Sequence, residues 1–255
     1  FRPRRSLALD RAALSRGGLL PKEADARRVA DQFRRIKRPL MRNLAHRAGE
    51  GLDRAHLVLV ASALPGEGKT FTATNLAFSL ALERDVSVLL IDADVAKPHL
   101  SRELGLADAP GLLDALADAT LDVEHLIHGT DDPSLLFLPA GQPSELANEL
   151  LESDRMLEIC AQLTRRLPNH VLLFDSAPLL LTNEGVAVSH IVGQVVLVVR
   201  AGSTRRSAVQ EALASIGDGP KVGLVLNQAS PALGQPGYYM YGTYGYPVPD
   251  GRSGA

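Results

Sequence analysis

Six short apolar runs alternate with amphipathic helical patterns in this chain of 255 residues, and that alternation constrains its fold more than any other feature. The runs occupy residues 56–62, 86–92, 134–140, 170–176, 194–200 and 221–227. Strands that are apolar on both faces are typical of a parallel sheet covered by helices. The helical patterns occupy residues 69–83, 144–167 and 203–217. We therefore predict a doubly wound α/β fold with a mostly parallel sheet, and a ligand site where its strands end.

The helical segment 144–167 contains the only cysteine of the chain, Cys160. A single cysteine excludes an internal disulfide framework and a cysteine-based metal cluster, and it is typical of a reducing compartment. We expect Ser144 to cap this helix at its start. The apolar residues expected to share one face of the helix are Leu146, Leu150, Leu157, Cys160 and Leu167.

A glycine-bearing loop joins the first apolar run to the first helix in the stretch LVLVASALPGEGKTFTATNLA. Strand, loop and helix in this order, with Gly68, Lys69 and Thr70 opening the helix, predict a phosphate-binding loop of a P-loop NTPase. Lys69 is expected to reach the β and γ phosphates of ATP, and the Thr70 hydroxyl is expected to bind Mg²⁺. Ala63 replaces the first glycine of the usual pattern. The residues expected to bind the nucleotide are Pro65, Gly66, Glu67, Gly68, Lys69, Thr70 and Phe71.

Acidic residues follow two other predicted strands. Asp92 and Asp94 end the run VLLIDAD, and Asp175 ends the run VLLFDS. One such residue alone is usually a strand terminator, but three beside a phosphate loop suit Mg²⁺, which prefers carboxylate, hydroxyl and water oxygens. We expect Asp94 and Asp175 to join Thr70 at the metal, and Asp92 to act as a general base.

Other polar residues give weaker signals. Asn227 ends the last predicted strand and is expected either to recognise the adenine edge or to cap the strand. His125 and His128 are three residues apart, but a metal site needs further ligands, so we expect them to be surface residues.

The last 26 residues contain 10 glycines and prolines and every tyrosine of the chain. This composition predicts a disordered tail over residues 230–255. One interpretation is a sticky or unstructured low-complexity segment. The other is a phosphoacceptor segment, because a tyrosine on a mobile tail can enter and leave a catalytic cleft. The candidate acceptors are Tyr238, Tyr239, Tyr241, Tyr244 and Tyr246.

The net charge of −2 hides an asymmetry. Residues 1–48 carry 14 Lys and Arg against 4 Asp and Glu, and the remainder carries 13 against 25. The basic part is a solvated face, a contact to an acidic neighbouring subunit, or a contact to anionic lipid headgroups. Few aromatic residues are interleaved with its basic residues, so nucleic acid is not expected as a partner. We divide the chain into a basic helical region that could contact another subunit (1–49), a P-loop domain (50–229) and the tail (230–255).

Three stretches, ALPGEGKT, LLIDADVAKP and VLLFDSAP, resemble the Walker-type motifs of the bacterial tyrosine kinases, the autokinases of exopolysaccharide synthesis and export. The tyrosine tail and the stretch QPSELANELLESDRM are similar to the same family, and the basic start is most similar to its exosortase-associated subgroup. DQFRRIKRPL resembles the family helix that makes subunit contacts, here with Asp31, Arg34 and Lys37.

The resemblance implies ATP- and Mg²⁺-dependent autophosphorylation of the tail tyrosines, usually between subunits of a ring. It also implies a membrane adaptor, a tyrosine phosphatase that reverses the reaction, and a cytoplasmic position at the inner face of the membrane. No apolar run approaches the length of a membrane span, so we expect a separate adaptor or a chain from which a segment has been cut.

Two alternatives come from other functional classes. Partition and septum-placement ATPases share the predicted fold and act as nucleotide-dependent switches without tyrosine phosphorylation. They typically carry an additional lysine early in the phosphate loop, where this chain has Leu64. The second alternative is a scaffold that binds ATP without transferring phosphate.

Overall fold

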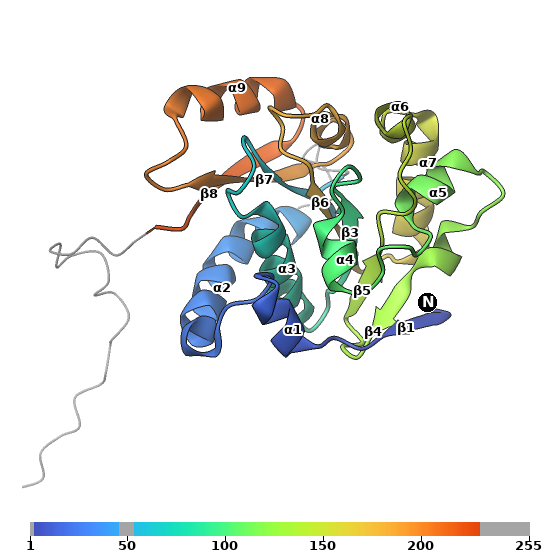
Figure 1. Ribbon diagram of the computed structural model, residues 1–255, viewed down its shortest axis with the longest axis horizontal. Coiled ribbons are helices and arrows are strands. Elements are labelled where there is room, and N and C mark those ends of the chain that lie inside the picture. The colour runs from blue at the N-terminus through green and yellow to red at the C-terminus, as the bar shows by residue number, and fades with distance from the viewer. Residues whose placement is uncertain (1–2, 46–53, 230–255) are drawn as a thin grey trace, which may run out of the picture.

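The computed structural model describes residues 3–45 and 54–229. Within these ranges the chain forms an eight-stranded sheet with helices on both faces (Figure 1). The strands are β1 (Arg5–Leu7), β2 (Leu57–Ser62), β3 (Ser87–Ala93), β4 (His128–Thr130), β5 (Leu135–Leu138), β6 (His170–Ser176), β7 (Gln194–Arg200) and β8 (Lys221–Asn227). The helices are α1 (Arg11–Arg16), α2 (Glu23–Ala45), α3 (Lys69–Ala81), α4 (His99–Glu103), α5 (Leu112–Ala117), η1 (Val123–Leu126), α6 (Ala147–Leu151), α7 (Asp154–Arg166), α8 (Glu184–Ser189) and α9 (Arg206–Ile216).

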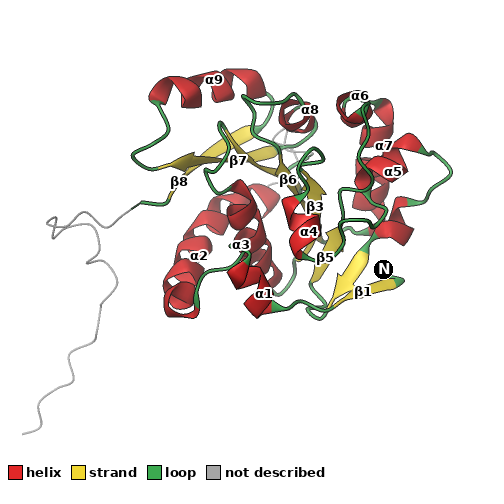
Figure 2. Cartoon of the chain, viewed as in Figure 1, coloured by secondary structure: helices red, strands yellow, loops and turns green. Residues whose placement is uncertain are grey.

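The sheet confirms the predicted fold class. Its strand order is β1-β4-β5-β3-β6-β2-β7-β8, and every neighbouring pair is parallel except the antiparallel pair of β4 and β5. The first predicted strand lies in the interior as β2, between β6 and β7. Figure 2 shows the helices lying over the strands on either side. Because β2, β3, β6, β7 and β8 run in the same direction, their carboxyl ends share one edge of the sheet.

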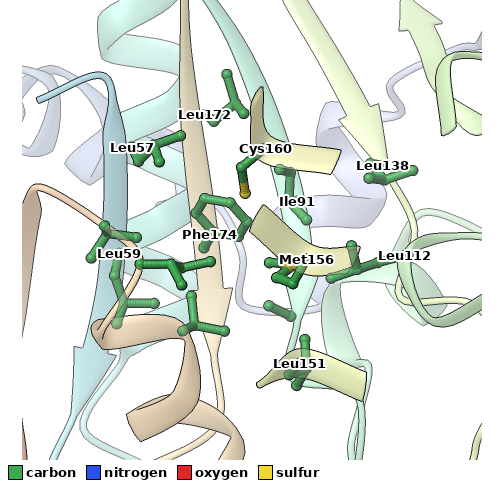
Figure 3. Packing of buried hydrophobic residues seen from close by; sticks show 14 of the residues in the cluster. Leu57, Leu59, Ile91, Leu112, Leu138, Leu151, Met156, Cys160, Leu172 and Phe174 are labelled. Carbon is green, nitrogen blue, oxygen red and sulfur yellow. The ribbon is translucent and has the colours of Figure 1, made fainter. Parts of the chain in front are cut away.

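Apolar side chains fill both faces of the sheet. On one face, Phe174 from β6 and Ile91 from β3 lie next to Met156 and Cys160 from α7 (Figure 3). Cys160 is 4% exposed and so belongs to the core, as its predicted apolar helix face requires. The opposite face packs against α2 and α3, with Leu76 and other fully buried residues of α3 at its centre. The sheet is thereby enclosed over its central strands and holds the strand ends in fixed positions.

The segment 144–167 forms two helices instead of the single predicted one. α6 ends at Leu151, and α7 begins at Asp154 with Ser153 in the N-cap position. Because α6 and α7 are separate helices, residues before and after the break do not follow one 3.6-residue repeat and do not share one face. Leu146 and Leu157 are accordingly 60% and 40% exposed, which corrects the predicted apolar face. The residues that face the core are Leu151, Met156, Ile159, Cys160, Leu163 and Leu167.

The predicted cap Ser144 lies before α6. Its hydroxyl accepts a hydrogen bond from the backbone N–H of Leu146 at 3.1 Å, and Leu146 occupies the N-cap position of α6. Ser144 therefore stabilises the turn that leads into a short helix, and it does not cap the long helix that the sequence predicted.

Two strands differ from the sequence prediction. β1 belongs to the basic N-terminal part of the chain and pairs in parallel with β4, so the sheet begins well before residue 50. Its three residues, Arg5 to Leu7, are too few and too polar to show a strand pattern. β8 was expected to be covered on both faces, but it lies at the sheet edge and most of its residues are exposed.

The basic N-terminal region forms the helices α1 and α2, and α2 packs against α3. Lys37 of α2 is only 8% exposed. Its ammonium group donates to the backbone oxygen of Ser79 and contacts the carboxylate of Glu83, both at 2.6 Å. Lys37 thus holds α2 onto its own domain, which corrects the interpretation that it faces another subunit. Asp31 and Arg34 form an exposed ion pair along α2.

Among the described helices, none combines the length and the apolar character that crossing a membrane requires. The longest, α2, has 23 residues and a strongly charged surface. Its basic residues therefore lie on a helix that covers the domain and leaves one side exposed.

Substitution of Lys37 should test its structural role. Lys37→Ala removes a charged donor from the backbone oxygen of Ser79, so we expect it to lower the free energy of unfolding by about 1.5–3 kcal/mol. Arg34→Ala, on the exposed side of the same helix, should change that free energy by no more than about 0.5 kcal/mol. Urea denaturation of the two variants provides the comparison, and equal stability of both would contradict the buried contact.

Candidate functional site

The loop between β2 and α3 has the geometry of a phosphate cradle. β2 ends at Ser62, and α3 begins at Lys69 directly after Gly68, which has a left-handed φ of 93°. Gly66 also has a positive φ of 77°. Side chains other than glycine rarely adopt such angles, so the two glycines allow the loop to turn back over the start of the helix. Backbone N–H groups at a helix start of this kind attract phosphate oxygens.

A buried carboxylate holds the loop from behind. Glu67 is 2% exposed, and its Oε2 atom accepts a hydrogen bond from the backbone N–H of Leu64 at 2.9 Å. Its other oxygen, Oε1, accepts a hydrogen bond from the hydroxyl of Thr204, which follows β7. Glu67 therefore fixes the shape of the loop and joins it to a neighbouring strand end. It was predicted to contact the nucleotide, but it does not line the cavity described below.

The end of β8 also contacts the loop. The side-chain amide of Asn227 donates to the backbone oxygen of Glu67 at 2.8 Å, and that of Gln228 donates to the backbone oxygen of Gly66 at 3.1 Å. A Cβ atom on Gly68 would lie 2.1 Å from the Asn227 amide nitrogen, so only glycine fits there. Asn227 does not line the cavity, and its side chain braces the loop.

A cavity of about 390 Å³ opens in front of the loop. Six of the predicted nucleotide-binding residues line it: Pro65, Gly66, Gly68, Lys69, Thr70 and Phe71. Asp94, predicted as a metal ligand, lines it as well. The sequence interpretation missed the remaining walls, which are Gly18, Leu19, Ala96, Lys97, His99, Arg102, Ala177, Pro178, Leu181 and Thr182.

Two of the missed walls have different origins. Gly18 and Leu19 come from the turn between α1 and α2, and the backbone oxygen of Leu19 accepts a hydrogen bond from Asn75 of α3 at 2.8 Å. Nothing in the local sequence indicates this contact, because 56 residues separate its partners. Lys97 lies within the stretch LLIDADVAKP and Arg102 follows it, and their positive charges near a predicted phosphate site were a signal that could have been used.

The predicted charged residues converge at the strand ends. The ammonium group of Lys69 lies 2.6 Å from the carboxylate of Asp94, and both side chains are largely buried. Burial lowers the pKa of Lys69, but the carboxylates of Asp175 and Asp94 outweigh it, so this pKa lies above its ordinary value. Lys69 therefore stays positively charged, and the structure shows it bound to an acidic side chain at the cavity wall.

Asp175 lies at the end of β6 and is 1% exposed. Burial raises the pKa of its carboxyl group to about 8, although the charge of Lys69 opposes the shift. The hydroxyl of Thr70 also opposes the rise in this pKa, while the Oδ1 atom of Asp175 has no hydrogen-bond partner among the described residues. An enclosed oxygen without a partner beside a hydroxyl group is a suitable donor set for a hard cation such as Mg²⁺.

Asp92, the predicted general base, does not reach the cavity wall. It is fully buried, and its Oδ2 atom accepts hydrogen bonds from the backbone N–H and the hydroxyl of Ser101 at 2.8 and 2.7 Å. Burial raises its pKa to about 6, and the bonds from Ser101 limit the rise. The carboxylate therefore positions the start of α4 in this structure, since the side chain has no exposed surface from which to accept a proton.

The remaining candidates from the sequence are two histidines and the five tyrosines. His125 belongs to η1 and is exposed, which confirms its predicted surface position, whereas His128 on β4 is buried, which corrects the same prediction for that residue. The described residues contain no group of three or more His, Cys, Asp or Glu side chains that could hold a metal ion by themselves. All five candidate acceptor tyrosines, Tyr238, Tyr239, Tyr241, Tyr244 and Tyr246, lie outside the described residues.

Comparison with known proteins gives a consistent set of matches. The CobQ/CobB/MinD/ParA nucleotide binding domain family matches residues 58–229. EpsB of Ralstonia nicotianae is 31% identical over 199 residues that cover 75% of this chain and 26% of EpsB. Its name describes it as a predicted tyrosine-protein kinase. Tyrosine-protein kinase YwqD of Bacillus subtilis is 31% identical over 62% of this chain and 66% of YwqD. This chain therefore spans about a quarter of EpsB.

A solved structure agrees with these relatives. The crystal structure of the VpsO kinase domain is 29% identical, has a TM-score of 0.66, and covers 82% of this chain and 100% of that domain. EpsB and YwqD are thus named as tyrosine-protein kinases, and the likeness to VpsO extends over the whole of the solved kinase domain.

Substitution of Glu67 should weaken nucleotide binding. Glu67→Ala leaves the N–H of Leu64 and the hydroxyl of Thr204 without their acceptor, so the loop loses its fixed shape. We expect the dissociation constant for ATP to rise about tenfold, which corresponds to about 1.4 kcal/mol. Isothermal titration calorimetry measures this change. Glu149→Ala, an exposed carboxylate on α6, is the matched control and should bind ATP as the parent does.

The raised pKa of Asp175 predicts a pH dependence of stability. Between its ordinary value near 3.8 and its folded value near 8, the folded chain holds a proton that the unfolded chain has lost. Stability should therefore fall as pH rises from 6.5 to 8.5 in metal-free and nucleotide-free buffer, by at most about 1.4 kcal/mol per pH unit. Asp175→Asn should flatten this slope, whereas Asp108→Asn at an exposed position should not. Chemical denaturation across this pH range measures it, and an unchanged slope in Asp175→Asn would contradict the assignment.

Proposed function

The chain belongs to the CobQ/CobB/MinD/ParA nucleotide-binding family, and we propose that it is an ATP-dependent protein-tyrosine autokinase that phosphorylates its own C-terminal tyrosines. One observation carries the proposal. The charged cluster of Lys69, Asp94 and Asp175 adjoins a phosphate loop, and the strand that braces this loop leads directly into the segment with all five tyrosines. The kinase names of the relatives support the same conclusion.

Each residue of the loop receives a role from its position. We propose that the N–H groups of residues 66–70 bind the phosphates of ATP, and that Lys69 moves from Asp94 to the β and γ phosphates. Thr70 and Asp175 would hold Mg²⁺, which draws charge from the phosphates and so favours transfer. Lys97 and Arg102, which also line the cavity, add positive charge that attracts the nucleotide.

In the proposed reaction, the phenolic oxygen of a tail tyrosine forms a bond to the γ phosphorus while the bond to the bridging oxygen of ADP breaks. The phenol has an ordinary pKa near 10 and must lose its proton. Of the three acidic residues at the strand ends, only Asp94 lines the cavity, so we assign proton acceptance to Asp94. Asp92 is then a positioning residue that acts through Ser101.

The proposed partners follow from the relatives and from the charge of α2. We propose that the chain assembles with copies of itself in a ring and that a membrane adaptor of polysaccharide export recruits it to the inner face of the cell membrane. A tyrosine phosphatase would reverse the modification. Arg34, exposed on α2, is a candidate for these contacts, whereas Lys37 is occupied within the domain.

The nucleotide-dependent switch of the partition type is less well supported. The additional lysine of that class is replaced here by Leu64, which lies in the loop and is 40% exposed. A switch also gives no role to the concentration of tyrosines after β8. The two functions differ in one product, because only a kinase leaves phosphotyrosine on the chain.

Incubation of the purified chain with Mg²⁺ and γ-labelled ATP tests the proposal. The label should appear as phosphotyrosine in the peptide that contains Tyr238 to Tyr246, as read by mass spectrometry. Lys69→Met should reduce the label about 100-fold because it removes a charge at the transferred group. Lys22→Met at an exposed position is the matched control and should keep full labelling.

A variant with all five tyrosines changed to phenylalanine should bind ATP normally and accept no label. ATP hydrolysis without phosphotyrosine in the parent chain would instead indicate the partition-type switch. Parental labelling in Lys69→Met would contradict the assignment of the loop.

A further inference from the structure

β8 leaves one edge of the sheet open. Among the described strands it pairs only with β7. The backbone N–H of Lys221 donates to Gly193, and the backbone oxygen of Asn227 accepts from Ala201, so odd-numbered residues of β8 direct their backbone groups toward β7. Backbone direction alternates along a strand. The N–H and C=O groups of Val222, Leu224 and Leu226 therefore point away from the sheet, where they meet no other strand of the described chain.

The same three residues also expose their side chains. Val222, Leu224 and Leu226 are 36%, 59% and 66% exposed. They lie on one face of β8, since Val222 and Leu224 pair with Val195 and Leu197, which are buried on the face that α9 covers. Figure 1 shows α9 and β8 on the same side of the molecule. α9 covers β7 through Ala212 and Ile216 but leaves the apolar stripe of β8 uncovered.

An open edge with apolar side chains is unusual. Edge strands are normally protected by charged residues, proline or bulges, because their free backbone groups pair readily with other chains. β8 has one charged residue, Lys221, at its first position, and the six residues after it are uncharged. A segment that binds to this edge must therefore supply both backbone hydrogen bonds and apolar side chains.

The tail has the properties that this edge requires. It begins at residue 230, three residues after β8 ends, and residues 230–249 contain no charged side chain. The stretch GQPG at 234–237 is rich in turn-forming residues, so the chain can reverse there. Beyond it, residues 238–244 contain four tyrosines and Met240, and tyrosine favours strands. Asn227 and Gln228, hydrogen-bonded to the phosphate loop, fix the point from which the tail departs.

We propose that residues 238–244 of the unmodified tail add to β8 as an antiparallel ninth strand and cover the stripe formed by Val222, Leu224 and Leu226. The acceptor tyrosines then rest on the edge of the domain, outside the cavity, until the tail is released. This gives order to a segment whose composition by itself predicts disorder.

The consequence for regulation rests on the proposed kinase function. Each phosphate adds about −1.5 to −2 charges to a tyrosine. A charged group cannot remain against an apolar stripe without losing hydration, so a phosphorylated tail leaves β8. Phosphorylation would thus reopen the edge strand and expose the stripe to another molecule.

The chain supplies its own probe for the docked tail. It has no tryptophan, and its five tyrosines all lie in residues 238–246, so the tyrosine band of the near-ultraviolet circular dichroism spectrum reports on the tail alone. The measurement uses the full chain, dephosphorylated and without nucleotide. We expect a distinct tyrosine band in the parent and its loss in the double variant Leu224→Ser, Leu226→Ser.

The matched control is the double variant Leu82→Ser, Leu146→Ser. These leucines are 76% and 60% exposed and belong to elements away from β8, so the band should persist. A band that is equally strong in both double variants, or that is absent from the parent, would overturn the proposal. Loss of the band on dilution would overturn it too, because it would assign the edge to a second copy of the chain.

Amide hydrogen exchange gives a second readout that needs no variant. In the parent, the outward N–H groups of Leu224 and Leu226 should exchange about tenfold more slowly than the rate expected for the same amides when no strand pairs with the outer edge of β8. Exchange at unprotected rates would overturn the docking. Because neither measurement involves phosphate transfer, a failure here leaves the kinase proposal standing, and a chain without kinase activity can still show a docked tail.

Discussion

Parallel pairing of β2 between β6 and β7 is the constraint on which the rest of the molecule depends. In a parallel sheet, every strand ends at the same edge, so the loop after β2, the carboxyl group of Asp175 after β6 and the hydroxyl of Thr204 after β7 meet there. β3 extends the sheet beyond β6 and brings Asp92 and Asp94 to the same edge. No single one of these segments makes a site. Their convergence is a direct result of strand direction and order.

Burial sets the chemistry of this edge. Asp92 and Asp175 are almost fully enclosed, and burial is the largest cause of the raised pKa of both carboxyl groups, with the neighbouring carboxylates adding to it. Lys69 is the opposing charge, and its contact with Asp94 keeps the cluster together. Three carboxyl groups lie near a single ammonium group, so the cluster can bind a further cation. The Oδ1 atom of Asp175 is enclosed and has no hydrogen-bond partner among the described residues. This is the electrostatic situation in which a divalent cation and a bound triphosphate stabilise each other.

The phosphate loop also links distant parts of the chain. The turn at Gly18 and Leu19 closes one side of the cavity, and Asn227 and Gln228 brace the loop from behind. The N-terminal region and the end of β8 are therefore both in contact with the elements that surround the nucleotide cavity. A change in the loop can reach the end of β8 through two hydrogen bonds, and α2 through the turn that precedes it.

The sequence by itself determined the fold class, six of the eight strands and the identity of the loop, because continuous apolar runs and a glycine-bearing strand-to-helix turn leave few alternatives. It also identified Lys69 and the three acidic residues, since residues at strand ends must share an edge. Only the tertiary structure decided which of them face the cavity. Asp92 bonds to Ser101 and Glu67 turns inward, and both contacts depend on segments that are distant in sequence or on a backbone turn that local pattern does not specify. The break between α6 and α7, the strand β1 and the open edge of β8 were likewise decided by packing, because the number of neighbours that cover an element is a property of the assembled fold.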